Sequence, residues 1–295
     1  MTQPTSLFSR IHSHASAFVM ASILLTGITS ATAQAEQIPR IISAGAAVTE
    51  LVVALGAEKQ LVVVDVTSHL PQNLDLPKIG YHRRLSSEGL LALQPTTLIG
   101  SDEIGPDSTI QQLKSTGVEV EIVNTDSNID GLLNRIDQIA DITRTQDNAI
   151  QVKEDVNKQV AALKANQVSK SNAKKMLFLL IHEGRPANVA GLDTTPDAII
   201  KLAGGINPAS DKLTSYKPLS MESLVEMQPD VILVSGRSYK KLGGADEILA
   251  ALPMLAATPA GINKQIITLN GSALVGGLGL NSLAEAKRLN ALVYP

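Results

Sequence analysis

One long helical pattern, residues 146–168, contains neither glycine nor proline and separates two blocks of short apolar runs. Val156 and Val160 recur within it at helical spacing, which predicts an uninterrupted helix. Short strands alternate with helices in both flanking blocks, and this alternation favours parallel βα units. We therefore predict an α/β protein in which this helix connects an N-terminal lobe, 36–145, to a C-terminal lobe, 169–295. An inserted helical bundle is the alternative interpretation.

Apolar and β-branched runs mark the strands of both blocks, and Gly or Pro residues punctuate the connections. Two glycine clusters, 204–205 and 276–279, are expected to be turns, because no G-x-x-x-x-G-K-[ST] phosphate-binding pattern occurs. The predicted strands lie at residues 40–44, 61–66, 97–100, 118–123, 176–181, 231–234 and 265–269.

Residues 1–35 have the composition of a secretory signal peptide. Arg10 is their only basic Lys or Arg residue, and an apolar run covers 15–28. Ala33-Gln34-Ala35 then fits an A-x-A cleavage pattern. Since the apolar run is short for a transmembrane helix, we expect a soluble exported protein with cleavage after Ala35. An N-terminal membrane anchor is the alternative.

Composition excludes several classes of site. The net charge of −3 and the lack of a basic run give no electrostatic footprint for nucleic acid, so we expect no such partner. The absence of cysteine excludes disulfides, iron–sulfur clusters, cysteine-ligated zinc and a lipidated cysteine.

Two segments, 85–95 and 219–229, match each other at a constant offset of 134 residues. Leu, Ser, Glu, Leu, Gln and Pro recur at the same places, which indicates equivalent capped helices in two lobes of similar build. Glu88 and Glu222 occupy the same position in the repeat, so these carboxylates are candidates for a shared task. Surface glutamates favoured by the helix dipole are the alternative.

Tyr81 stands out because it is followed by His82, Arg83 and Arg84 in a chain with only four tyrosines, three phenylalanines and no tryptophan. A neighbouring cation favours an ionised phenol, and phenolate oxygen is one of the few protein ligands of ferric haem. The arginines could pair with haem propionates. The alternative is an interfacial tyrosine on a basic loop.

His182 follows a predicted strand, at the end of a βα unit where such folds place ligand sites. His69 occupies a comparable loop of the first lobe, with weaker support. No H-E-x-x-H and no G-x-S-x-G pattern occurs, so neither a zinc site nor a serine hydrolase is indicated. An α/β enzyme that uses His182 and Glu183 as an acid–base pair is the alternative from a different functional class.

The segment GYHRRLSSEGLLALQPTTLIGSDEIGP resembles the signature of periplasmic haem-binding proteins that serve bacterial haem ABC importers. The similarity extends over RIISAGAAVTELVVALGA, FLLIHEGR and TSYKPLSMESLVEMQPDVILVSG. It implies two Rossmann-like lobes joined by one long helix, with the ligand in the cleft between them. It also implies a binding protein and not an enzyme. Siderophore and cobalamin binding proteins share the broader pattern and are the alternatives within the class.

The resemblance assigns roles to individual residues. Tyr81 would be the tyrosinate ligand of the haem iron, Arg83 its hydrogen-bonding partner, and His182 a second iron ligand. Tyr216, Lys217 and Arg237 would be further haem-contacting residues. Relatives can carry Arg before Pro where this chain has Lys217, and lysine lacks the bidentate fork of arginine.

The resemblance also implies partners. Glu88 and Glu222 match the two glutamates that dock onto arginines of the inner-membrane ABC permease dimer, which accounts for the repeat. Haem would be the transported ligand, and an outer-membrane haem receptor system would be an indirect partner.

Overall fold

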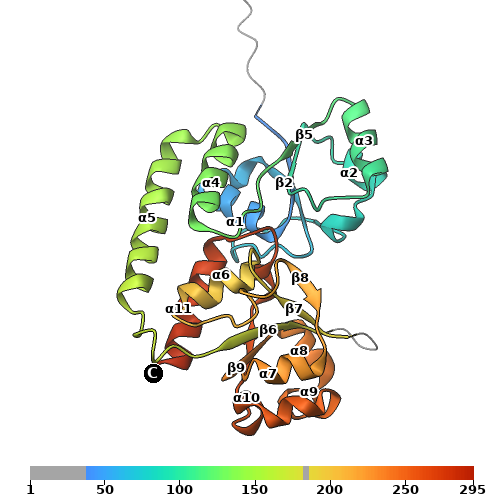
Figure 1. Cartoon of the computed structure of the whole chain (residues 1–295). Helices are drawn as coiled ribbons and strands as arrows, with labels where there is room; N and C mark the ends of the chain where they lie inside the picture. The colour runs from blue at the N-terminus through green and yellow to red at the C-terminus, as the bar shows by residue number, and fades with distance from the viewer. Residues whose placement is uncertain (1–37, 182–185) are drawn as a thin grey trace, which may run out of the picture. The chain divides into compact units, whose positions relative to one another are not determined.

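Five short strands form a parallel sheet in the N-terminal lobe of the computed structural model, which describes residues 38–181 and 186–295 (Figure 1). Their order is β3-β2-β1-β4-β5, and each neighbouring pair is parallel. The strands are β1 (Ile41–Ala44), β2 (Leu61–Asp65), β3 (Lys78–Ile79), β4 (Thr97–Gly100) and β5 (Glu119–Ile122). The helices are α1 (Ala46–Ala54), α2 (Ser87–Leu91), α3 (Asp107–Ser115) and α4 (Ile129–Thr143), with 3₁₀ turns at Glu58–Gln60 and His82–Arg84.

The C-terminal lobe contains a second five-stranded sheet in the order β10-β9-β6-β7-β8. Its β6, β9 and β10 are parallel, whereas β7 pairs antiparallel with both β6 and β8. The strands are β6 (Met176–Leu180), β7 (Asn188–Ala190), β8 (Tyr216–Pro218), β9 (Val231–Ser235) and β10 (Ile266–Leu269). The helices are α6 (Thr195–Leu202), α7 (Met221–Glu226), α8 (Gly236–Leu242), α9 (Ala245–Ala251), α10 (Pro259–Ile262) and α11 (Leu280–Val293), with 3₁₀ turns at Pro253–Ala257 and Gly271–Leu274.

These two sheets confirm the predicted α/β class with two βα lobes. The sequence pattern missed β3, β7 and β8, because runs of two or three residues are too short to show a period-two alternation. The antiparallel pairs of the second sheet therefore depart from the purely parallel arrangement that the alternation predicted.

The internal repeat is present in the backbone. β4 and β9 begin 134 residues apart, and each lies next to the first strand of its lobe. The glutamine before each of these strands, Gln94 or Gln228, adopts a positive φ, 50° and 45° respectively. Since few residues other than glycine adopt this conformation, the two segments share the same turn. Their helix starts differ, because the Ser220 side chain caps α7 whereas the equivalent Ser86 makes no capping hydrogen bond to α2.

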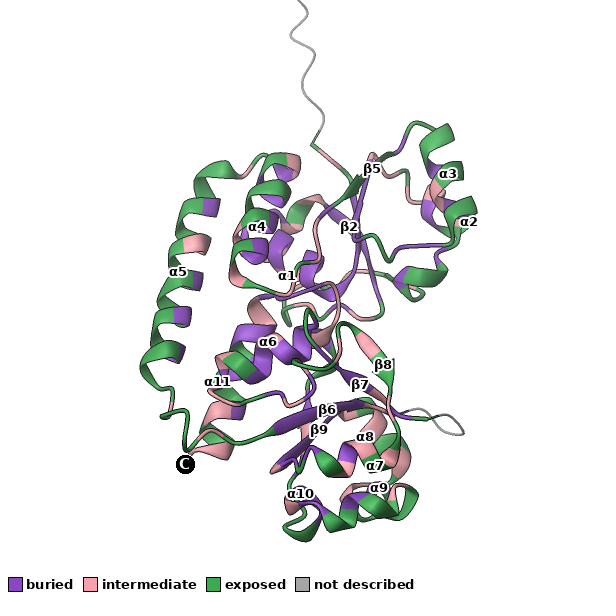
Figure 2. Cartoon of the chain, in the orientation of Figure 1, coloured by how far each residue is buried: buried purple, intermediate pink, exposed green. Residues whose placement is uncertain are grey.

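The long helix α5 covers Gln146–Ala165 and so ends three residues before the predicted boundary at 168. Its buried residues form one stripe, and the rest of its surface faces outward (Figure 2). This stripe packs against α4 of the first lobe and α11 of the second. Among the helices of the described ranges, none is both long and apolar enough to cross a membrane.

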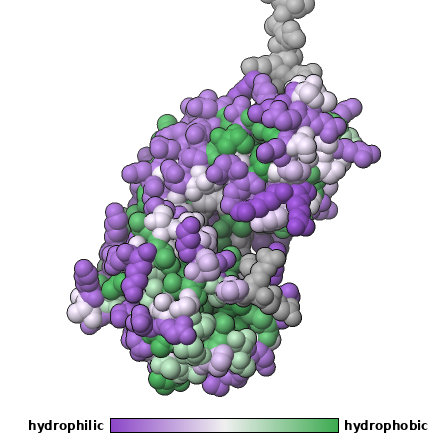
Figure 3. Space-filling view, turned by 45° about the vertical axis from the view of Figure 1, so that its right-hand side comes forward, coloured by the Kyte–Doolittle hydropathy of each residue, from purple (hydrophilic) through white to green (hydrophobic). Residues whose placement is uncertain are grey.

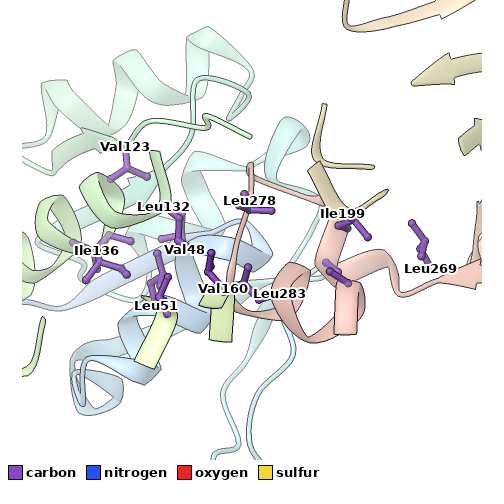
Figure 4. Close-up of a cluster of buried hydrophobic side chains, with 14 of the residues drawn as sticks. Val48, Leu51, Val123, Leu132, Ile136, Val160, Ile199, Leu269, Leu278 and Leu283 are labelled. Atoms are coloured by element: carbon purple, nitrogen blue, oxygen red, sulfur yellow. The ribbon is translucent and has the colours of Figure 1, made fainter. Parts of the chain in front are cut away.

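One apolar cluster extends through both lobes (Figure 4). It includes Val48 and Leu132 of the first lobe, Val160 of α5, and Ile199 and Leu283 of the second lobe. Each fully buried side chain of this size stabilises the fold by about 1.5–3 kcal/mol relative to an exposed one. The lobes are therefore held together by a continuous core as well as by α5.

Two charged side chains of the first lobe make polar contacts with the start of α11. The Glu50 carboxylate accepts hydrogen bonds from the backbone N–H groups of Leu280 and Asn281, at 2.6 and 3.0 Å. Arg135 is fully buried and donates from Nη1 to the Leu278 carbonyl at 2.9 Å. The first N–H groups of a helix have no acceptor within the helix itself, and at the start of α11 the Glu50 carboxylate of the other lobe is their acceptor.

Burial raises the pKa of Glu50 to about 7, against the opposing hydrogen bonds from Asn281 and Leu280 and the charge of Arg135. In the unfolded chain this carboxyl ionises near 4.5. Folded protein then binds the proton more tightly, so the contribution of Glu50 to stability is fully present below about pH 4.5. It is lost as the pH rises through about 7, by up to about 3 kcal/mol.

We expect Glu50→Gln to flatten this part of the pH profile. The amide cannot ionise, so the difference in unfolding free energy between wild type and variant should change across pH 4.5–7, the window set by the pKa of Glu50. Urea denaturation at several pH values measures it. A difference that stays constant over the window would contradict the shift.

Candidate functional site

Tyr81 lies between the edge strand β3 and the 3₁₀ turn His82–Arg84. Two backbone hydrogen bonds tie this turn to the loop after β4: Gly105 N–H donates to the His82 carbonyl at 3.0 Å, and Leu85 N–H donates to the Gly105 carbonyl at 2.7 Å. The Tyr81 side chain is 38% exposed. The loop is thus fixed at its backbone while the phenol remains accessible.

The His82 ring is buried directly behind Tyr81. Its Nδ1 lies 3.0 Å from Oδ2 of Asp65, which is the last residue of β2 and fully buried. Although burial opposes ionisation, hydrogen bonds from His82, Ser68 and Thr67 hold the pKa of Asp65 below its usual range. Burial likewise opposes a charged imidazole, but Asp65 and Glu103 together raise the pKa of His82.

Glu103, in the loop after β4, faces both basic neighbours of Tyr81. Its Oε1 pairs with the Arg83 guanidinium, and its Oε2 lies 3.7 Å from Nε2 of His82. The nearby His82 ring and the Arg83 guanidinium lower the pKa of Glu103. A chain of alternating charge therefore runs from buried Asp65 to half-exposed Arg83.

A cavity of about 270 Å³ adjoins Glu103 and is lined by both lobes. Tyr216 of β8 contributes to its wall, and burial followed by the charge of Glu103 raises the pKa of this phenol. Three acidic side chains line the cavity, so it suits polar or cationic groups better than an anion. The lining residues are Asp102, Glu103, Thr125, Ser127, Asp193, Thr194, Thr195, Ser215, Tyr216, Leu274, Gly276 and Gly277.

Of the described residues predicted to contact the ligand, Tyr216 lines this cavity, whereas Tyr81, Arg83, Lys217 and Arg237 are exposed and do not. Lys217 lies in the edge strand β8, opposite Val189, and Arg237 lies in the first turn of α8. The structure thus pairs Arg83 with Glu103, places Tyr216 within reach of the Glu103 charge, and packs Tyr81 against the His82 ring. It leaves Lys217 and Arg237 on the surface. His182, predicted as the second iron ligand, lies outside the described residues.

Glu88 and Glu222 are both exposed in the first turns of their helices, α2 and α7. The Ser220 side chain caps α7 by accepting a hydrogen bond from Ser223 N–H at 3.2 Å. The backbone and Ser220 lower the pKa of Glu222.

Figure 3 shows that hydrophilic side chains dominate the upper part of one face, while hydrophobic ones are more frequent below.

Sequence reasoning missed Asp65 and Glu103 as parts of this site. A general rule could have indicated both, because ligand sites of parallel sheets lie at the carboxyl ends of the strands. Asp65 lies at such an end and Glu103 just after one. Their connection to His82 depends on the spatial order of β2, β1 and β4, which no local pattern reveals.

Several known proteins resemble this chain in sequence and in fold. The chain is 63% identical to the periplasmic haem-binding protein HutB of Vibrio cholerae, with a TM-score of 0.83, covering 88% of this chain and all of that one. It is 32% identical to the periplasmic haem-binding protein BhuT in complex with two haems, with a TM-score of 0.77, covering 86% and 99%. A vitamin B12-binding protein of Vibrio parahaemolyticus is 26% identical over 208 residues, 70% of this chain and 74% of that one. Residues 41–273 match the periplasmic binding protein family model, and the chain belongs to that family.

Proposed function

We propose that this protein captures ferric haem in the periplasm and delivers it to the permease of an ABC importer. The observation that carries the proposal is the accessible Tyr81 phenol, backed by a buried His82–Asp65 pair, in a chain 63% identical to a haem-binding protein over that protein's whole length. Haem is the cargo here, and the protein needs only to bind and release it.

Tyr81 is the proposed iron ligand. Phenolate oxygen binds ferric iron, and its exposure leaves room for a flat tetrapyrrole to approach. Arg83 is the proposed hydrogen-bonding partner of the bound phenolate, since a guanidinium has five N–H donors and can serve Glu103 and a second acceptor together. His182 is proposed as a second iron ligand.

Cations outside the acidic cavity are proposed to meet the haem propionates. Lys217 and Arg237 are exposed, so each can reach a carboxylate without a desolvation cost for the free protein. The acidic cavity lining of Asp102, Glu103 and Asp193 would repel a propionate. Tyr216 is proposed to contact the macrocycle from the second lobe.

Cobalamin is the second candidate ligand, because the vitamin B12-binding relative shares 26% identity over most of both chains. A large corrin needs extensive aromatic walls, and only 2% of this chain is aromatic. Titration with cyanocobalamin in place of haemin separates the two candidates.

Two further assignments follow from the proposed route. Residues 1–35 are proposed to be a signal peptide cleaved after Ala35; they lie outside the described residues. Glu88 and Glu222 are proposed to dock onto the two halves of the permease, since each is exposed at the same position of a repeated helix.

The test is a haemin titration followed by absorption spectroscopy. Wild type should bind haemin with the charge-transfer absorption of a ferric tyrosinate. Tyr81→Phe should lose that absorption and bind at least about 100-fold more weakly, since even groups that only orient a metal ligand are worth about 10–100-fold.

Tyr239→Phe is the matched control, because Tyr239 is partly buried against the core of the second lobe, and its variant should match wild type. An unchanged spectrum and affinity in Tyr81→Phe would show that Tyr81 is not the ligand. Saturable binding of cyanocobalamin without haemin binding would favour the second candidate.

A further inference from the structure

The side chains next to Tyr81 make more polar contacts than are needed to hold its loop in place. We infer that Asp65, His82 and Glu103 form a positioning chain that sets the orientation of the Tyr81 ring and the Arg83 guanidinium toward an iron-bound tetrapyrrole. This inference rests on the proposed function and adds three residues to it, none of which is expected to touch the iron.

The chain begins at a rigid anchor. Asp65 ends β2 and receives hydrogen bonds from Gly45 N–H at 3.2 Å, Ser68 Oγ at 2.8 Å and Thr67 Oγ1 at 2.9 and 2.8 Å to its two carboxylate oxygens. With His82 Nδ1 at 3.0 Å, both oxygens of this buried carboxylate are held. A carboxylate fixed by so many donors has one orientation, and it transmits that orientation to the imidazole.

The second link joins His82 to Tyr81. The two ring centroids lie 4.2 Å apart with an angle of 52° between the ring planes. Because His82 is only 1% exposed and held by Asp65, it cannot turn away when Tyr81 moves. The tilted contact therefore restricts the rotation of the phenol about its χ angles, which are otherwise free in an exposed side chain.

The third link fixes the opposite edge of His82 and the charge on Arg83. Nε2 of His82 is buried, has no hydrogen-bond partner among the described residues, and faces Oε2 of Glu103 at 3.7 Å. The other oxygen of Glu103 pairs with Arg83. One carboxylate thus holds the ring behind Tyr81 and the guanidinium beside it.

His82 has a structural role as the partner of the buried Asp65 carboxylate, and only its Nδ1 edge serves that role. Its Nε2 is buried without a hydrogen bond among the described residues, which costs stability, and it faces Glu103. The contacts of the ring with Tyr81 and Glu103 are additional to the pairing with Asp65, and the orientation of Tyr81 and Arg83 is the role we infer for them.

The test compares four variants with wild type and Tyr81→Phe by haemin titration, charge-transfer absorption and resonance Raman spectroscopy of the iron–phenolate bond. His82→Phe keeps a ring beside Tyr81 but loses both polar anchors, and His82→Gln loses the ring contact. Both should raise the haemin Kd about tenfold and weaken the iron–phenolate signature, as expected for groups that orient a metal ligand.

Glu103→Gln keeps the shape of a partly exposed side chain, so it is expected to fold even where a change at buried His82 is not tolerated. It removes the carboxylate that holds the Arg83 guanidinium in place, so the hydrogen bond from Arg83 to the bound phenolate should weaken and the phenolate should donate more electron density to the iron. The charge-transfer band should therefore move to longer wavelength. Asp102→Asn removes the same charge from the same cavity. The Asp102 carboxylate accepts a hydrogen bond from Thr125 and acts on Arg83 through its charge, so this variant should leave the band in place.

The outcomes separate the inference from the proposed function. If wild type shows no Tyr81-dependent haemin signature, the proposed function fails and the inference fails with it. If the signature depends on Tyr81 but stays unchanged in every folded His82 variant and in Glu103→Gln, the positioning chain is wrong and the proposed function stands. Equal band shifts in Glu103→Gln and Asp102→Asn would also overturn it, since they would show an effect of charge alone.

Discussion

Arg135→Ala is expected to destabilise the protein by about 3–5 kcal/mol, the range measured when one partner of a buried charged network is removed. Arg135 is fully buried in α4, at the point where the first lobe meets the segment before α11. In a chain of this size the loss corresponds to a fall in Tm of about 10 °C.

The size of the effect follows from the number of carbonyl groups that Arg135 serves. Its guanidinium donates to the carbonyls of Asn124 at 2.5 Å, Leu278 at 2.9 Å and Asp126 at 3.1 Å. Alanine leaves these acceptors without their donor and creates a cavity that water fills only in part. It also removes a cation whose charge lowers the pKa of Glu50, although burial already lowers the pKa of Arg135 to about 10.

Lys153→Ala is the matched control, since it removes the same charge from a pair that Lys153 of α5 makes with Asp137 of α4. Exposed pairs contribute about 0–1 kcal/mol, so this variant should unfold close to wild type. Urea denaturation followed by far-UV circular dichroism measures both. Equal midpoints for the two variants would show that the Arg135 contacts do not hold the lobes together.

The elements that the sequence predicted best are those whose signal is local. Apolar strands and the stripe of α5 follow directly from periodicity, and the repeat around Glu88 and Glu222 needed only an internal comparison. The three missed strands are too short to carry a period. α5 ends at Ala165 because Asn166 leaves helical geometry and the following segment is polar.

The contacts behind the site depend on tertiary structure and were beyond sequence reasoning. Asp65 and Glu103 lie 38 residues apart and meet His82 only because β1 brings β2 and β4 into one sheet. Glu50 and the start of α11 are 230 residues apart in the chain. Tyr81 itself was found from composition, because a lone tyrosine among arginines is conspicuous in a chain with so few aromatics.

The double variant Glu88→Ala, Glu222→Ala is expected to abolish haem transport while leaving haem affinity intact. Both carboxylates are exposed, one in each lobe, at the first turns of α2 and α7. Neither lines the cavity beside Glu103, so their loss should not change haemin binding. A single exposed ion pair is worth about 0–1 kcal/mol, but a charge pair that becomes buried in an interface costs about 2–5 kcal/mol when truncated.

Two such pairs on one rigid body act together, because the first contact with the permease keeps the second carboxylate close to its own partner on the permease. The double variant should therefore lose at least about 1000-fold in affinity for the permease, and each single variant should lose part of it. The measurement is haem-dependent stimulation of the transporter ATPase in proteoliposomes, with haemin titration of each variant beside it. Glu154→Ala with Glu247→Ala removes the same charge from exposed sites on α5 and α9 and should transport normally. Normal transport by the Glu88, Glu222 double variant would mean that the repeat records the similar folding of the two lobes and has no part in docking.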